Sequence, residues 1–213
     1  MDDALFDRLA LSLPAPWIDH ADRDFASDLV RSLDSAVHQF NDALVACDFF
    51  KPFTPDGVIW DTSGAVCRRD APLEDRLRFL YARAYLYSLD STRAFVHVLS
   101  TQPGIPPAAE AACKDFLQRF GDIREIRNSL QHIEERAQAK GSFGKRLTGP
   151  ILDLGSLNEL RFGITTGSGQ RMEVEISEQF LELVRSALVE IIWSFEWIAV
   201  GNVRVRPPEG TAA

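Results

Sequence analysis

The chain has 213 residues, of which 46% are hydrophobic and 25% charged, and its formal net charge is −8 at pH 7. This composition is typical of a globular protein with a packed core, and it weighs against a disordered or repetitive chain. The length suits a single domain. The negative net charge excludes general nucleic-acid binding, because phosphate backbones are bound mainly by lysine and arginine. A polyanion would therefore have to bind at a local basic site.

Cysteine usage and apolar patterning predict a soluble, cytoplasmic protein. The three cysteines, Cys47, Cys67 and Cys113, lie far apart, so we expect neither a disulfide framework nor a paired-thiol metal site. The apolar stretch at residues 180–200 contains four charged residues, too many for a bilayer span. The chain begins Met-Asp-Asp, which predicts no signal peptide. We therefore expect no membrane association.

Four segments have apolar residues at spacings of three and four, which predicts four amphipathic helices over 22–48, 72–101, 108–139 and 178–200. Gly121 is the only weak point of the third helix, because glycine has a low helix propensity. The apolar stripes are Phe25, Leu29, Leu33, Val37, Phe40, Leu44 and Cys47; Leu77, Leu80, Ala84, Tyr87, Phe95 and Val98; Ile123, Ile126, Leu130, Ile133 and Ala137; and Phe180, Val184, Leu188, Ile191 and Phe195. We expect these stripes to pack against each other.

Between the third and fourth predicted helices, apolar residues recur at every second position instead of every third or fourth. Residues 159–166 and 171–177 alternate around the turn Gly167-Ser168-Gly169-Gln170, which predicts a β-hairpin. The expected fold is mainly α: an antiparallel four-helix bundle with a small β-hairpin insert at about 150–176, between the third and fourth helices. We expect one helical domain over residues 1–213, with 1–20 as an N-terminal extension and 207–213 as a flexible tail.

The histidines predict no metal site. The chain has four of them, and they form neither an HExxH motif nor a His-x-His pair that could chelate a metal ion. Gly141-Ser142-Phe143-Gly144-Lys145 lacks the spacing of a phosphate-binding loop. We therefore expect no metal and no cofactor.

Residues 124–136 concentrate polar side chains on one helical face. At about 100° per residue, six of them share an arc of about 140° on the side away from Leu130. These residues are Arg124, Arg127, Asn128, Gln131, His132 and Glu135. From Lys114 to Arg146 there are eight basic and five acidic residues, in a chain whose net charge is negative. This local excess of positive charge suits a restricted RNA site.

The string Arg127-Asn128-Ser129-Leu130-Gln131-His132 resembles the signature of the HEPN superfamily, an arginine and a polar residue followed after a few residues by a histidine. Only these positions carry the resemblance, together with the third-helix location and the helical organisation. It implies a metal-independent endoribonuclease with a composite site at a homodimer interface. It also implies a role in a bacterial defence or toxin–antitoxin system, with a protein partner such as an antitoxin. Members that bind nucleotides without activity belong to the same superfamily, so the resemblance leaves catalysis open.

The residue types suit RNA cleavage without a metal. Histidine has an ordinary pKa of about 6.5 and can transfer the proton of the 2′-hydroxyl, so His132 would be the base or the acid. A guanidinium can hold two phosphate oxygens as charge develops, which is the role expected of Arg127. Asn128 would orient the imidazole or a phosphate. The remaining side chains expected to bind the RNA are Arg124, Gln131 and Arg136.

The alternative is a catalytically inactive helical module that binds a partner protein, a nucleotide or RNA. Trp193 and Trp197 lie one turn apart and could anchor such a partner, although aromatics at this spacing are usually core residues. The two hypotheses differ at the third helix. Arg127 and His132 lining one concave cleft across a dimer would favour the enzyme, and their separation in solvent would favour the module.

Overall fold

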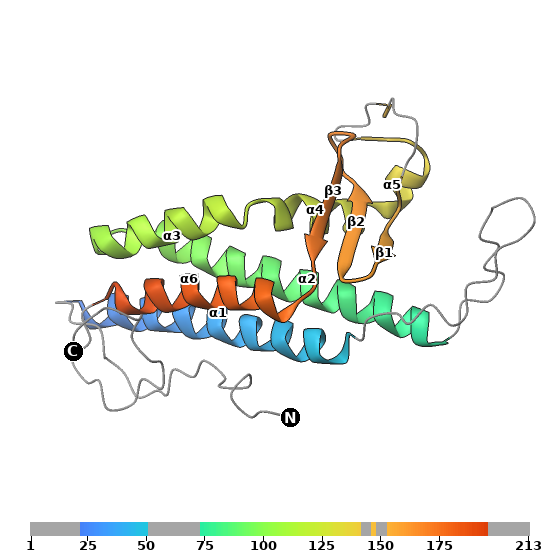
Figure 1. Cartoon of the computed structure of the whole chain (residues 1–213). Coiled ribbons are helices and arrows are strands. Elements are labelled where there is room, and N and C mark those ends of the chain that lie inside the picture. The colour runs from blue at the N-terminus through green and yellow to red at the C-terminus, as the bar shows by residue number, and fades with distance from the viewer. Residues whose placement is uncertain (1–21, 51–72, 142–145, 148–152, 196–213) are drawn as a thin grey trace, which may run out of the picture.

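The computed structural model describes residues 22–50, 73–141, 146–147 and 153–195, and this part of the chain is mainly helical with a small antiparallel sheet (Figure 1). The helices are α1 (Arg23–Phe49), α2 (Leu73–Ser100), α3 (Pro107–Arg119), α4 (Asp122–Gln131), α5 (Ile133–Ala137) and α6 (Glu178–Trp193). The strands are β1 (Ser156–Asn158), β2 (Arg161–Thr165) and β3 (Arg171–Glu175). None of the helices in this described part combines the length and apolarity that crossing a bilayer requires.

The first two helices have the predicted bounds. Asp22 caps α1, because its side chain accepts hydrogen bonds from the backbone N–H groups of Asp24 and Phe25 at 3.0 and 3.1 Å. α2 begins at Leu73 and ends at Ser100, close to the predicted limits. The predicted extension at 1–20 and the predicted tail at 207–213 lie outside the described residues.

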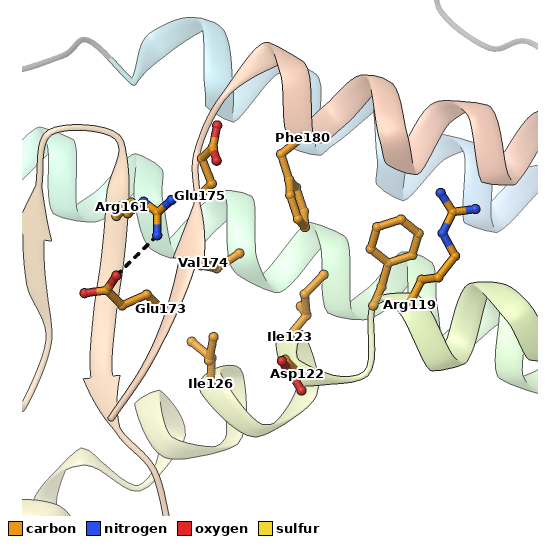
Figure 2. Close-up of a pocket in the computed structure, with 10 residues that line it drawn as sticks. Arg119, Asp122, Ile123, Ile126, Arg161, Glu173, Val174, Glu175 and Phe180 are labelled. Carbon is orange, nitrogen blue, oxygen red and sulfur yellow. Dashed lines mark ion pairs between the residues drawn. The ribbon is translucent and has the colours of Figure 1, made fainter. Parts of the chain in front are cut away.

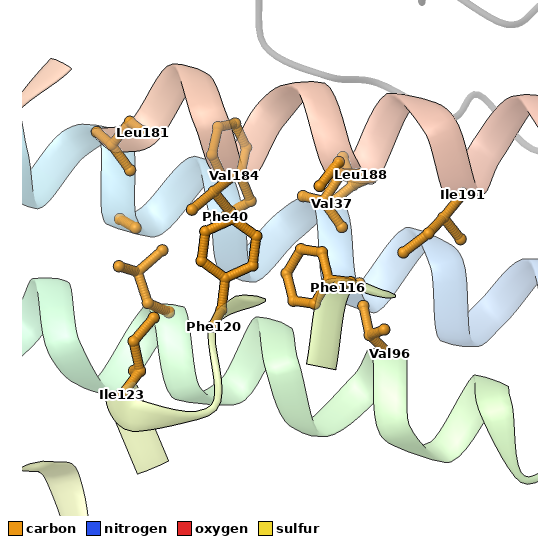
Figure 3. Packing of buried hydrophobic residues seen from close by; sticks show 14 of the residues in the cluster. Val37, Phe40, Val96, Phe116, Phe120, Ile123, Leu181, Val184, Leu188 and Ile191 are labelled. Atoms are coloured by element: carbon orange, nitrogen blue, oxygen red, sulfur yellow. The ribbon is translucent and has the colours of Figure 1, made fainter. Parts of the chain in front are cut away.

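The core lies between four of the helices. α1 packs along α2, α2 along α3, α3 against α6, and α6 against α1. Figure 3 shows side chains from these helices meeting in one apolar cluster, with Phe40 and Phe116 near its centre. The predicted stripes of α1 and α6 contribute as expected, because Leu29, Leu33 and Leu188 are buried.

The predicted stripe of α2 does not face this core. Leu77, Leu80, Ala84, Tyr87 and Val98 are exposed, so their predicted burial is wrong. The buried residues of α2 are Ala82, Tyr85, Leu86, Leu89, Val96 and Leu99. The physical reason is that α2 is apolar around most of its circumference, and helical periodicity alone cannot say which of two apolar faces is buried.

The third predicted helix is interrupted, so the prediction of one helix over 108–139 is wrong. α3 ends at Arg119, and Phe120 leaves the helix with φ −114° and ψ 23°. The Phe120 ring lies in the core against Phe116 and Phe180, with centroid distances of 4.8 and 5.9 Å. Gly121, a poor helix former, follows directly and precedes α4.

A second interruption follows at His132, which ends α4 with φ −110° and ψ 36°. Ile123, Ile126 and Leu130 are buried as predicted. Beyond the break, Ile133 is half-buried and Ala137 is exposed, so the predicted stripe stops at Leu130. The cause is the change of backbone direction, which removes α5 from the helical phase of α4.

The predicted hairpin is present as β2 and β3, and β1 adds a third strand that the sequence pattern did not predict. The strand order is β1-β2-β3, both pairs are antiparallel, and Phe162 lies opposite Val174. The turn closes with the Thr166 N–H donating to the Gln170 carbonyl at 2.8 Å, and Gly169 has φ +88°. The Tyr85 hydroxyl donates to the Glu175 carbonyl at 3.2 Å, which joins the sheet to α2.

The hydroxyl of Ser177 caps α6, accepting from the Phe180 N–H at 3.1 Å. α6 ends at Trp193, earlier than the predicted residue 200, and Ser194 and Phe195 follow it outside the helix. The remaining residues of that predicted helix, Trp197 among them, lie outside the described part of the chain.

Candidate functional site

Arg127 makes an ion pair between α4 and α2. Its Nε donates to the Asp90 Oδ2 at 2.6 Å, and its Nη2 pairs with the same oxygen. The Asp90 side chain is only 4% exposed and the Arg127 side chain 24% exposed. Arg127, predicted on the polar face of its helix, is therefore bound by a buried carboxylate of the neighbouring helix.

Asp90 has a second cationic partner. The Nε of Arg93, one turn further along α2, donates to the Asp90 Oδ1 at 3.1 Å, and the Arg93 side chain is 11% exposed. A buried carboxylate requires such partners, because its desolvation is otherwise unfavourable. Two guanidinium groups and one carboxylate leave this cluster with one net positive charge beside α4.

The guanidinium of Arg127 still has donors to offer. It carries five N–H groups, of which Asp90 takes two and the Gln131 Oε1 takes one from Nη1. Within the described part of the chain, the other two have no partner. Arg127 is thus fixed on one side by Asp90 while part of its donor set remains for an external acceptor such as a phosphate oxygen.

His132 stands at the end of α4. Its backbone N–H donates to the Asn128 carbonyl at 3.2 Å, and its side chain is 53% exposed. The Nδ1 atom lies 3.6 Å from the Glu135 Oε1. The imidazole is therefore accessible to a ligand, and a neighbouring carboxylate can orient it.

The structure joins some of the predicted site residues and separates others. Gln131 contacts Arg127, whereas Arg127 and His132 are joined by no hydrogen bond or ion pair among the described residues. Five positions along a helix amount to about 140° of rotation and about 7.5 Å of rise, which accounts for their separation. Asn128 is half-buried and Arg124 is exposed. The side chain of Arg136 is not among those that the structure describes.

The hairpin insert reaches α4 at its turn. The Ser168 hydroxyl donates to the Glu125 Oε1 at 2.9 Å, which ties the tip of the β2–β3 hairpin to the helix that carries Arg127. Sequence reasoning missed this contact, and also Asp90. For Asp90 a signal existed, because a carboxylate followed three residues later by Arg93 interrupts an otherwise apolar part of α2.

A cavity of about 240 Å³ lies beside α4 (Figure 2). Ile123, Ile126, Val174 and Phe180 form its apolar lining, and β2, β3 and the start of α6 bound it. The charged residues at its edge include the pair of Arg161 and Glu173, whose atoms are 3.6 Å apart. Neither Arg127 nor His132 lines this cavity, so it is not the predicted cleft.

No family model, no curated protein and no solved structure matches this chain. The described residues contain no group of three or more His, Cys, Asp or Glu side chains that could hold a metal ion.

Proposed function

We propose that this chain is a HEPN-like, metal-independent endoribonuclease with a composite site formed by α4 of two copies. The observation that carries the proposal is the Arg127 guanidinium, which a buried carboxylate fixes while two of its N–H groups have no partner among the described residues. His132 supplies an accessible imidazole at the C-terminal end of the same helix. A fixed cation and a titratable base are the two groups that cleavage of RNA by its own 2′-hydroxyl requires.

In the proposed reaction the 2′-oxygen attacks the adjacent phosphorus. The 2′-O–P bond forms and the P–O5′ bond breaks, which gives a 2′,3′-cyclic phosphate and a free 5′-hydroxyl. One His132 removes the proton of the 2′-hydroxyl, and His132 of the second copy donates a proton to the leaving 5′-oxygen. Arg127 holds the non-bridging oxygens as negative charge builds on them.

A homodimer follows from this chemistry. One imidazole cannot lie on both sides of an in-line displacement, so two copies are needed to supply a base and an acid. Asn128, Arg124, Gln131 and Arg136 are the proposed RNA-binding residues around the pair. The packing of α1, α2, α3 and α6 supports a four-helix bundle as the scaffold, and a role in bacterial defence with an antitoxin-like partner follows from the resemblance alone.

The second candidate is a non-catalytic helical module. The observation that favours it is the same ion pair, because a cation that joins α2 to α4 has a sufficient structural reason to be there. In that case Arg127 stabilises the fold and His132 is an ordinary surface residue. The two candidates make opposite predictions for a substitution of the exposed histidine.

The deciding experiment replaces His132 by alanine. The enzyme hypothesis predicts at least a 100-fold loss of RNA cleavage with an unchanged melting temperature, because general acid–base catalysis contributes about 10² to 10⁴ and the side chain is exposed. His38→Ala is the matched control, since His38 is also exposed and also pairs with a carboxylate, Asp34 at 3.5 Å. Equal cleavage by wild type and His132→Ala would reject the assigned role.

Product chemistry provides an independent test. We expect 2′,3′-cyclic phosphate ends, and we expect cleavage to persist in excess EDTA because imidazole and guanidinium perform the steps above. Arg127→Lys keeps the charge and the link to Asp90 but removes the planar fork, so it should lower cleavage more than stability. Chelator-sensitive cleavage restored by magnesium would instead favour a metal-dependent mechanism.

A further inference from the structure

α2 has a second apolar stripe that faces away from the core. Its members follow each other at alternating spacings of three and four, six are exposed and Ser91 is half-buried. We call this stripe the outer seam; it consists of Leu77, Leu80, Ala84, Tyr87, Ser91, Ala94 and Val98. None of these residues is charged. Such a seam is what a helix presents to another helix that packs along it.

Exposed apolar side chains are concentrated at this seam. Of the eight large hydrophobic residues that are exposed in the described part of the chain, four belong to the outer seam, and Leu80 is 58% exposed. Two more, Val45 and Phe49, lie at the end of α1 that adjoins it, where the Phe49 ring stacks on Tyr81 at 5.3 Å. A concentration of this kind marks an interaction surface.

We propose that the outer seam is the homodimer interface, on which α2 of a second copy packs antiparallel. This inference rests on the proposed function, since it names the surface that assembles the composite site. The choice of a second copy as the occupant depends on three observations: the position of the Arg127 ion pair, the charges beside the seam and the area that a dimer needs.

The ion pair of Asp90 and Arg127 lies close to the midpoint of the outer seam, so a dimer formed there combines Arg127 from both copies in one site. The outer seam runs from Leu77 to Val98, so its midpoint is near Tyr87. Asp90, which binds Arg127, lies only three residues or about 4.5 Å along the helix from that midpoint. A two-fold axis through the midpoint therefore places both Arg127 ion pairs next to the axis, one on each side. The second copy then contributes its own Arg127 to the same site.

The charges beside the seam favour the antiparallel arrangement. Arg76 and Arg83 are exposed next to its N-terminal half. Parallel helices would bring these arginines together across the interface, where like charges repel. Antiparallel helices move them apart, and packing about Tyr87 sets each Arg76 beside the last turn of the other α2, whose carbonyl groups carry a partial negative charge.

The outer seam alone is smaller than a standard dimer interface, so the proposed interface also includes α4. The seam is about 32 Å long and one helix, about 10 Å, wide, so it covers about 300 Å² per copy. A standard interface buries about 800 Å² per partner. The contact must therefore spread to both sides of α2, over Val45 and Phe49 at one end and over the polar face of α4. This extension brings Arg124 and Gln131 of the two copies towards each other.

The first test measures mass by light scattering. Leu80→Glu and Tyr87→Glu place a charge on the seam, and each should raise the dimer dissociation constant at least about 100-fold. Leu183→Glu is the matched control, because Leu183 is a 53% exposed leucine on α6, away from the seam. Melting curves should show all three variants folded, since the replaced side chains are exposed. A monomeric wild type, or seam variants that dimerise as tightly as the control, would overturn the proposal.

The second test fixes the orientation. Chains carrying Leu80→Cys are mixed with chains carrying Ala94→Cys and treated with a short bifunctional maleimide. Antiparallel packing about Tyr87 predicts cross-linking in the mixture and none in either variant alone, with wild type as the background control. Cross-linking of each variant to itself would indicate parallel helices and overturn the arrangement.

Cleavage assays on the same samples separate the two proposals. Seam variants that stay dimeric and cleave RNA would overturn the seam and leave the proposed function standing. A dimer that depends on the seam, but in which His132→Ala cleaves RNA like wild type, would overturn the proposed function and leave the seam standing. Full cleavage by a wild-type monomer would overturn both the seam and the composite site.

Discussion

α2 and the run from α3 to α5 differ although the sequence predicts one helix for each. α2 continues for 28 residues, whereas the other run is divided into helices of 13, 10 and 5 residues. Both segments have helical periodicity, so the difference lies in their surroundings. Phe120 contributes its ring to the core and leaves the helix to do so, and Gly121 offers little resistance. Periodicity predicts the type of an element better than its length.

The candidate site lies where the uninterrupted helix meets the divided one. The breaks allow α4 to contact β2 and β3 as well as α2 (Figure 1). α2 provides the buried carboxylate of Asp90, and α4 provides the arginine that pairs with it. The regular helix thus supplies the anchor, and the short helix carries the groups proposed to bind and cleave RNA.

The largest expected effect tests which face of α4 is buried. Leu130 is 7% exposed, so Leu130→Asp should lower the free energy of unfolding by about 4 kcal/mol or more, because an unpaired charge would enter the core. Gln131→Asp, at the exposed next position, is the control and should cost no more than about 1 kcal/mol. The measurement is urea denaturation. Equal midpoints for wild type and Leu130→Asp would mean that α4 faces the other way.

An intermediate effect is expected where the two helices meet. Asp90→Ala leaves Arg93 and Arg127 without their carboxylate and should cost about 2 to 4 kcal/mol, whereas Arg127→Ala leaves Arg93 in place and should cost about 1 to 3 kcal/mol. A double-mutant cycle should give a coupling energy of about 1 to 3 kcal/mol.

The control for that cycle is the exposed pair of Glu110 and Lys114 on α3, whose side chains are 41% and 67% exposed. Their coupling should stay below about 0.5 kcal/mol, because solvent screens exposed ion pairs. Similar coupling energies for the two pairs would contradict the view that Asp90 fixes Arg127 through a desolvated contact.

Much of the fold followed from local signals. The three-and-four spacing of apolar residues predicts α1, and the turn Gly167-Ser168-Gly169-Gln170 predicts the hairpin. β1 was missed because its three residues are too few to display an alternating pattern. The buried face of α2 was assigned wrongly because both of its faces are apolar, and only the packing of the other helices decides between them.

The candidate site was less predictable, for a related reason. The grouping of Arg127, Asn128 and His132 on one helix follows from periodicity, but the partner of Arg127 lies 37 residues earlier in the chain. No spacing rule connects Asp90 to Arg127, because the contact exists only after α2 and α4 pack together. The break at His132 likewise depends on tertiary context. The polar face predicted from the sequence continues to Glu135, whereas the helix that carries it ends before His132.

A pH-dependent effect tests whether α3, the first part of the divided run, is firmly buried. Burial raises the pKa of the Cys113 thiol to about 12 from an ordinary value of 9.0. Between these values the unfolded chain loses this proton while the folded chain keeps it, so the unfolded state binds fewer protons and the free energy of unfolding falls as pH rises. The slope from one such group reaches about 1.4 kcal/mol per pH unit. In urea denaturation, the free energy of unfolding of Cys113→Ala should therefore fall less steeply between pH 9 and 11 than that of wild type. Tyr85, whose pKa burial also raises, is present in both proteins and affects both slopes equally. Identical slopes would show that the Cys113 thiol is not shielded from solvent and that α3 is not firmly buried at this position.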